Sequence, residues 1–384
     1  MAIALQDLWQ HLQRQLFPTL VEELGELGEK DHEFVRVVSL LPLGKFLEPY
    51  RWKGIGCPPH ERAWLVHAYI AKGVYQFSTT EAVVVALKTN PTLRRLCGWE
   101  KASDVPSVST FSRAFAQFAA DELPQKVHEA LVKLHCGPKL VGHTSHDATA
   151  VSVPERPPAP AVPAAAATAE PGVRRKRGRP KKGQEPPPPP PTRLQLQPRR
   201  SLAENLADLP RACDIGAKKG SKGHMEYWRG YKLHLSVIDG DIPISAILTS
   251  ASTHDSQVAI PLMQMSAQRV TDLYDLMDSA YDAEAIHECS RGLGHIPLID
   301  IHPRRDAALR EELQAEKKRR QRLSFNYAEA VRFRERTTVE RVNARLKDEF
   351  GGRMIRVRGH AKVICHLMFG ILALAADQIL RLVT

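Results

Sequence analysis

The sequence predicts an α/β protein in which a mixed sheet is covered by helices and preceded by an all-helical region. Residues 1 to about 138 show helical apolar spacing and little strand pattern, whereas strand and helix patterns alternate after residue 200. A chain of 384 residues with 43% apolar and 25% charged residues can bury a core and is long enough for two or three domains. We therefore expect a helical domain over residues 1–138 and an α/β domain over residues 139–384.

The helical region contains a segment that is typical of DNA-binding helices. In "VPSVSTFSRAFAQFA", Ser107 or Ser109 precedes Phe111, Phe115 and Phe118 as an N-cap, as in the second helix of a helix-turn-helix. An ordinary capped helix explains the same pattern, so both interpretations remain open. Lys and Arg total 54 against 43 Asp and Glu, a net charge of +11, which favours a polyanionic partner such as nucleic acid. We therefore expect residues 1–138 to bind DNA.

Strand patterns begin after residue 138. "KLVGHTSHDATAVSV" is rich in β-branched residues and predicts a strand that ends near Asp147. "RGYKLHLSVIDGDIPISAILTSAS" contains two alternating runs joined at Asp239 and Gly240, which predicts a hairpin. Further on, "IPLMQMSAQR" predicts a helix, and "VTDLYDLMDSAYDAEAIHECSRGLG" predicts a strand ending at Asp278 followed by a helix capped by Asp282. "HIPLIDIH" predicts another strand, which completes the alternation expected of a mixed sheet.

A Pro-rich, basic segment interrupts the α/β region from about residue 154 to residue 200. It includes six consecutive prolines (Pro186 to Pro191) and the block "RRKRGRPKKG", and this composition predicts a flexible insert rather than a fold. "KRGRPKK" resembles an AT-hook, in which Arg177 and Arg179 would enter the minor groove of A·T-rich DNA. A nonspecific cationic tether that raises DNA affinity explains the block equally well.

Two helices are expected at the end of the chain. In "FRERTTVERVNARLKDEF", residues 333–350, four polar side chains form one stripe (Arg336, Glu340, Asn343 and Lys347) beside an apolar stripe. Solvated ion pairs would explain the polar stripe of a lone helix. The last stretch, "VICHLMFGILALAADQILRLV", has an uninterrupted apolar part too short to span a bilayer, so we expect a buried core helix and no membrane partner.

The six cysteines and the N-terminus argue against a zinc-binding, disulfide-rich or secreted protein. The cysteines are scattered, with no C-x-x-C pair, which indicates neither a zinc site nor a disulfide framework. The N-terminus carries no basic run followed by an apolar core, so no secretory signal is predicted. Both features fit a cytoplasmic protein.

Three carboxylates occur in an order that suits phosphoryl transfer with two metal ions. Asp147 and Asp278 are expected at strand ends and Glu340 on a helix, so separate rigid elements would bring them together. Hard oxygen ligands without a nearby cysteine favour Mg²⁺ or Mn²⁺. Other aspartates have structural explanations: Asp282 as a helix cap, Asp239 as a turn residue, and Asp255 as a loop or cap residue.

These residues resemble the Asp-Asp-Glu transposases of bacterial insertion sequences. The glutamate helix of that family carries an aromatic residue, an arginine, the glutamate and a lysine at set spacing, matched here by Phe333, Arg336, Glu340 and Lys347. The aromatic residue is usually tyrosine, so Phe333 departs from the pattern. The second-aspartate signature appears as "DSAY" from Asp278, and "GYKLH" and "STHDS" are also typical phrases. The resemblance covers nearly the whole chain except the insert.

The resemblance implies an RNase H-like fold and a set of roles. Asp147, Asp278 and Glu340 would be the catalytic residues and would hold two Mg²⁺ or Mn²⁺ ions, while Arg336 and Lys347 would contact DNA phosphates. Lys232, on a strand face of "GYKLH", either reaches DNA or is structural.

The implied activity is transposition in a bacterial cytoplasm. Such an enzyme binds the terminal inverted repeats of its element as double-stranded DNA, cleaves the ends, and joins the 3′-hydroxyls to target DNA as a homodimer. A DNA-binding repressor derived from a transposase, and an RNase H-like nuclease without strand transfer, are the alternatives.

Overall fold

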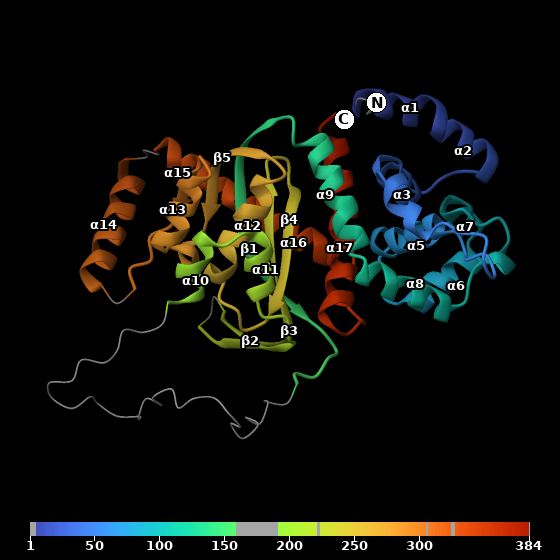
Figure 1. The fold of residues 1–384 in the computed structure, drawn as a ribbon. Coiled ribbons are helices and arrows are strands. Elements are labelled where there is room, and N and C mark those ends of the chain that lie inside the picture. The colour runs from blue at the N-terminus through green and yellow to red at the C-terminus, as the bar shows by residue number, and fades with distance from the viewer. Residues whose placement is uncertain (1–4, 159–190, 221–222, 305, 324–326, 384) are drawn as a thin grey trace, which may run out of the picture.

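The computed structural model describes residues 5–158, 191–220, 223–304, 306–323 and 327–383, and Figure 1 shows two connected regions. The first is all-helical, with no strand among the described residues before residue 140. Its helices are α1 (Leu5–His11), α2 (Phe17–Leu24), α3 (Glu29–Leu40), α4 (Gly44–Leu47), α5 (Arg62–Val74), α6 (Thr80–Thr89), α7 (Pro91–Cys97), α8 (Val108–Ala120) and α9 (Leu123–His135).

The expected N-cap of α8 is confirmed. The Ser107 hydroxyl accepts a hydrogen bond from the backbone N–H of Thr110, and Phe111, Phe115 and Phe118 are buried in the core. DNA binding by this helix stays a prediction.

The second region is built on a six-stranded mixed sheet. Five strands follow the order β2-β3-β1-β5-β6, and β4 pairs with β3. The central strand β1 is antiparallel to β3 and parallel to β5, which is in turn parallel to β6. The strands are β1 (Leu140–Ser152), β2 (Asp214–Lys219), β3 (Met225–Ile238), β4 (Ile242–Ser250), β5 (Thr271–Met277) and β6 (Ile296–Ile299). The predicted α/β class is therefore confirmed.

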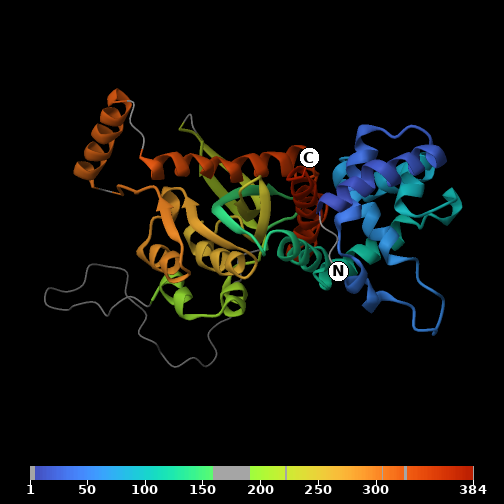
Figure 2. The ribbon, with the colours of Figure 1, turned by 90° about the horizontal axis from the view of Figure 1, so that it is seen from above.

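Helices cover both faces of this sheet. One face is covered by α12, and the other by α16, which crosses β1 and β3 (Figure 2). The helices of this region are α10 (Arg193–Leu196), α11 (Leu202–Asp208), α12 (Ser256–Ala267), α13 (Glu284–Gly292), α14 (Ala307–Leu323), α15 (Ala328–Phe333), α16 (Thr337–Asp348) and α17 (His360–Arg381).

The C-terminal helix α17 lies between the sheet and the N-terminal helices (Figures 1 and 2). It packs on β4 on one side and on α3, α5, α8 and α9 on the other. By length and composition it could cross a membrane, but 94% of its most apolar window is buried inside the protein. The predicted core helix is thus confirmed, and one continuous apolar core joins the two regions.

Several predicted boundaries are wrong. β1 does not end near Asp147 but continues to Ser152, because β3 supplies backbone partners as far as Gly230. The helix predicted over residues 333–350 is broken by a 3₁₀ turn at Arg334–Arg336, where Thr337 Oγ1 donates to the carbonyl of Arg334. The C-terminal end of the predicted insert has regular structure, since residues 193–199 form short helices that contact α12.

Asp282 does not cap the helix that follows it. The helix α13 begins at Glu284 with Ala283 in the N-cap position. The Asp282 carboxylate instead accepts the backbone N–H of His302 and pairs with the ring of His287. It therefore ties the segment after β6 to the start of α13.

Buried neutral histidines join elements of the core. His128 in α9 donates from Nε2 to the carbonyl of Pro243 in β4, and His366 in α17 donates to the carbonyl of Gly351. Burial lowers the pKa of His128 to about 3 and that of His366 to about 3. At mildly acidic pH, neither ring can be protonated while it remains buried in the folded protein.

Acid should therefore destabilise the protein. An unfolded histidine titrates near pH 6.5, so below about pH 6.5 the unfolded state binds protons that the folded state does not, and stability falls as pH drops toward about 3. Each histidine contributes at most about 1.4 kcal/mol per pH unit. Urea unfolding at pH 7.5 and pH 5 checks this, and the His128→Gln variant should lose less stability between these pH values than the wild type. An equal loss in both proteins would contradict the role given to His128.

Candidate active site

Two aspartates meet at the centre of the sheet. β1 and β5 are parallel neighbours, and their register pairs Ser145 with Leu276, so continuing it by two residues brings Asp147 level with Asp278. Burial, together with the charges of Asp278 and Asp255, raises the pKa of Asp147 to about 6 against the opposing hydrogen bond from the Ala148 N–H. The two predicted aspartates therefore lie close enough to repel each other.

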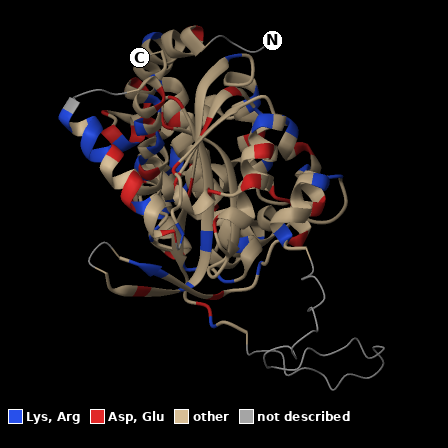
Figure 3. Ribbon diagram, turned by 90° about the vertical axis from the view of Figure 1, so that its left-hand side faces the viewer, with Lys and Arg blue, Asp and Glu red and all other residues tan. Residues whose placement is uncertain are grey.

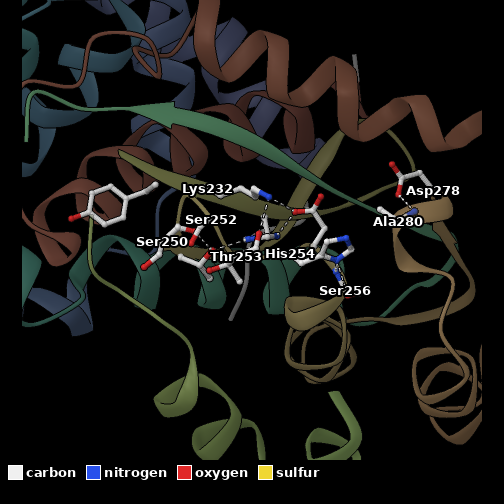
Figure 4. Close-up of polar contacts among 12 residues, drawn as sticks. Lys232, Ser250, Ser252, Thr253, His254, Ser256, Asp278 and Ala280 are labelled. Atoms are coloured by element: carbon white, nitrogen blue, oxygen red, sulfur yellow. Dashed lines mark hydrogen bonds and ion pairs between the residues drawn. The ribbon is translucent and has the colours of Figure 1, made fainter. Parts of the chain in front are cut away.

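The Asp278 carboxylate is oriented by its own backbone turn. Asp278 follows β5 directly, and its Oδ1 accepts the N–H of Ala280 at 2.9 Å (Figure 4). A hollow of about 460 Å³ opens beside it, lined among others by His254, His302 and Arg304. The second aspartate is thus fixed at the edge of an open, polar space.

The helix α16, which carries Glu340, lies beside β1. The Ser145 hydroxyl donates to the carbonyl of Glu335 in the 3₁₀ turn just before α16, and Lys347 Nζ donates to Thr149 Oγ1 near the end of the helix. Asp147 lies midway between Ser145 and Thr149 on the same strand face, because alternate residues of a strand point to one side. The middle of the α16 polar stripe therefore lies over Asp147.

The side chain of Glu340 is paired with Arg336. Arg336 Nη1 lies 2.9 Å from Glu340 Oε1, and the Glu340 side chain is 51% exposed. The Arg336 guanidinium also lies 5.8 Å from the centre of the Phe333 ring. Three residues of the predicted motif, Phe333, Arg336 and Glu340, are therefore in contact with one another.

The sequence did not identify a fourth carboxylate, that of Asp255. Asp255 stands at the N-cap position of α12, yet its side chain makes no cap hydrogen bond. Its Oδ1 pairs with Lys232 Nζ at 3.0 Å, and the same ammonium donates to the carbonyl of Thr253 (Figure 4). The charge of Asp255 also raises the pKa of both Asp147 and Tyr281. The family-typical phrase "STHDS" includes Asp255, but its neighbouring residues in the sequence do not distinguish a helix cap from a site residue.

Several buried polar atoms around these carboxylates lack a hydrogen-bond partner among the described residues. They are Tyr281 Oη, Arg336 Nε, and both Oδ1 and Nδ2 of Asn343. The charges of Asp255, Asp147 and Asp278 all act on the Tyr281 hydroxyl. A buried polar group without a partner costs about 1–3 kcal/mol, so such a cluster is typical of a site that receives a ligand.

The donor set fits a divalent metal. Burial and the nearby charges of Asp278 and Asp255 raise the pKa of Asp147, while the Glu340 carboxylate pairs with Arg336. Oxygen-only ligands suit Mg²⁺ and Mn²⁺. The oxygens of Asp147, Asp278 and Glu340 do not form a close ligand group among the described residues, so their joint role as metal ligands stays a prediction.

The predicted DNA-binding residues differ in their surroundings. Lys347 is half-buried, and burial lowers its pKa, with the charges of Arg353 and Lys218 adding to the effect. Lys232 is largely buried in its ion pair with Asp255. Arg177 and Arg179 lie outside the described residues. Figure 3 marks further Lys and Arg residues, with acidic residues between them, along the ribbon on the side of the molecule that carries α14.

A second polar cluster includes two aspartates of β5, the strand next to β1. Asp272, Asp275 and His295 are buried, and each offers a possible metal ligand within 4.8 Å of the others. His295 directs Nδ1 to Asp275 at 3.0 Å and Nε2 to Asp272 at 3.4 Å. Burial lowers the pKa of His295, but the Asp275 hydrogen bond and both carboxylate charges outweigh it and raise the pKa. This geometry is that of an imidazolium ring between two carboxylates.

Comparison with known families agrees with the predicted family and fold. Residues 142–376 match the model described as Transposase DDE domain, and residues 22–117 match the model described as Transposase domain (DUF772). No curated protein and no solved structure matches the chain. The first match covers more than half of the chain and includes Asp147, Asp278 and Glu340. The chain therefore belongs to the DDE transposases of insertion sequences, whose catalytic domain has an RNase H-like fold.

Proposed function

We propose that this transposase binds the terminal inverted repeats of its element, cleaves the DNA ends in a metal-dependent reaction, and joins the freed 3′-hydroxyls to target DNA. The observation that carries the proposal is the meeting of Asp147 and Asp278 at the centre of the sheet, beside the helix α16 that carries Glu340. Two copies are expected in the DNA complex, and the family implies DNA as the partner.

Different residues of the chain would have different roles in this reaction. Asp147, Asp278 and Glu340 would hold two Mg²⁺ or Mn²⁺ ions, which supply Lewis-acid activation of the attacking oxygen and stabilise charge on the scissile phosphate. Arg336 keeps Glu340 in place through their ion pair. Lys347 adds positive charge beside Asp147 while its ammonium is held by Thr149. Lys232 holds the Asp255 carboxylate through their ion pair. The negative charge of Asp255 is thereby kept near Asp147.

The test is a cleavage and joining assay with the DNA that flanks the coding region. The protein should nick the outer ends of the inverted repeats in Mg²⁺ but not in EDTA, and it should join 3′-hydroxyl ends to a target plasmid. Binding without nicking would favour a repressor. Nicking without joined products would favour a nuclease.

The insert should contribute to DNA binding but not to chemistry. Residues 159–190 contain the basic block and five of the six consecutive prolines, and the positive charges of this block can release counterions from DNA. Deleting them should weaken end binding and flatten its dependence on salt. Replacing Arg177 and Arg179 with alanine separates the alternatives, since only a minor-groove binder would lose its preference for A·T-rich DNA. Loss of nicking by the deletion variant at saturating DNA and low salt would contradict this prediction.

A further inference from the structure

We propose that the carboxamide of Asn343 is an additional ligand of the metal site, and that its Oδ1 binds the ion held by Asp147 and Glu340. This inference rests on the proposed function of that site. The motif of the glutamate helix leaves Asn343 without a role, although it shares a stripe with Arg336 and Lys347.

Asn343 is the most deeply buried member of that stripe. It lies in α16 one turn after Glu340, and its residue exposure is only 6%, whereas the Glu340 side chain is 51% exposed. Residues three apart on a helix are neighbours on one face. Asn343 therefore lies beneath Glu340, on the border between the polar stripe and the apolar side of the helix.

The contacts of α16 place Asn343 beside Asp147. Ser145 touches the helix at Glu335 and Thr149 touches it at Lys347, so the strand and the helix run side by side over this stretch. Asp147 is the middle residue of the strand segment. Glu340 and Asn343 are the stripe residues nearest the middle of the segment between these two contacts, so we infer that both lie near Asp147.

Neither polar atom of the Asn343 carboxamide has a hydrogen-bond partner among the described residues, although both are buried. Such a group is costly unless a ligand satisfies it, and an apolar side chain of similar volume would avoid the cost. The buried Asn205 differs in part, because its Nδ2 donates to the carbonyl of Gln197 and to Gln264 Oε1, although its Oδ1 also lacks a partner. In Asn343 neither polar atom of the amide is satisfied, so the whole carboxamide is free to bind a ligand.

The chemistry of that partner follows from the space and the neighbours. The amide is buried, so a small ligand can reach it more readily than a DNA strand. An amide oxygen is a hard ligand of the kind that Mg²⁺ and Ca²⁺ accept alongside carboxylates. Being neutral, it completes coordination without adding to the repulsion between Asp147 and its neighbouring aspartates.

Mn²⁺ binding provides a readout that does not depend on turnover. We would measure the free Mn²⁺ signal by electron paramagnetic resonance during titration of the full-length protein without DNA. Asn343→Leu should weaken Mn²⁺ binding at least tenfold, while its unfolding midpoint in EDTA stays at or above that of the wild type. Asn343→Asp keeps an oxygen ligand and should keep Mn²⁺ affinity, but in EDTA it should be less stable because it adds an unpaired charge.

Two control variants separate the possible failures. Asn205→Leu should leave Mn²⁺ affinity unchanged and lower the unfolding midpoint, because it removes hydrogen bonds away from the site. Asp147→Asn should lose Mn²⁺ binding, and wild-type affinity in that variant would overturn the proposed metal site itself. Wild-type affinity in Asn343→Leu, with binding lost in Asp147→Asn, would overturn the role of Asn343 alone. If Asn343→Leu does not fold, Asn343→Ala decides by the same criterion.

Discussion

Replacing Glu340 with glutamine is expected to lower Mg²⁺-dependent nicking of the element ends by at least about a hundredfold while DNA binding stays near the wild-type level. The substitution keeps the shape of the side chain and its place on α16, and the amide oxygen still accepts from Arg336. What it removes is a charge that holds a metal ion. That ion stabilises charge developing on the scissile phosphate, so its loss acts on the transition state more than on ground-state binding.

The matched control is Glu349→Gln at the other end of the same helix. Glu349 pairs with Arg345 at 2.8 Å through the same i,i+4 relation, here with the arginine again preceding the glutamate, and its side chain is 42% exposed. It should nick at nearly the wild-type rate. Nicking and end binding are measured on one preparation of each variant. Near-normal nicking by the Glu340 variant would contradict the metal-binding role of Glu340. The polar stripe of α16 would then be interpreted as a solvated helix face with ion pairs.

The arrangement of the sheet was largely predictable from the sequence because periodicity is a local property. Alternation located the hairpin around Asp239 and Gly240, and the strand before Asp278 ends where the pattern predicts. Once β1 and β5 are parallel neighbours, their register brings Asp147 and Asp278 together. The predicted association of the two aspartates therefore needed only the correct fold.

The parts that the sequence did not predict depend on contacts between distant residues. β1 passes Asp147 because β3 pairs with it to Ser152, and that pairing leaves no trace in the local pattern. Asp255 has the sequence context of a helix cap. Its ion pair with Lys232 of β3 and the effect of its charge on Asp147 depend on the folded structure. Asp275, which lies in the middle of β5, gave no sign of a polar cluster, because its partners come from three other segments.

Asp275 should be among the side chains that contribute most to stability. It is 1% exposed and accepts three hydrogen bonds, from His146 Nε2 at 3.0 Å, Ser290 Oγ at 2.6 Å and His295 Nδ1 at 3.0 Å. Burial by itself would raise its pKa, but the two histidines outweigh burial and lower it. The carboxylate therefore ties β1, α13 and the start of β6 to β5.

Asp275→Asn should destabilise the protein by roughly 3–5 kcal/mol at pH 7, because it removes the charge that compensates a buried imidazolium. The free energy of unfolding in urea measures this loss. Asp208→Asn is the control, since Asp208 pairs with Arg193 at the surface and should cost about 1 kcal/mol or less. The folded pKa of Asp275 is depressed, so its contribution is present above the unfolded value of about 3.9 and is lost as the pH falls below it. The difference between wild type and variant should therefore shrink toward pH 3. A loss at pH 7 no larger than that of Asp208→Asn would mean that Asp275 forms no buried ion pair with the histidines and that these groups are neutral when buried.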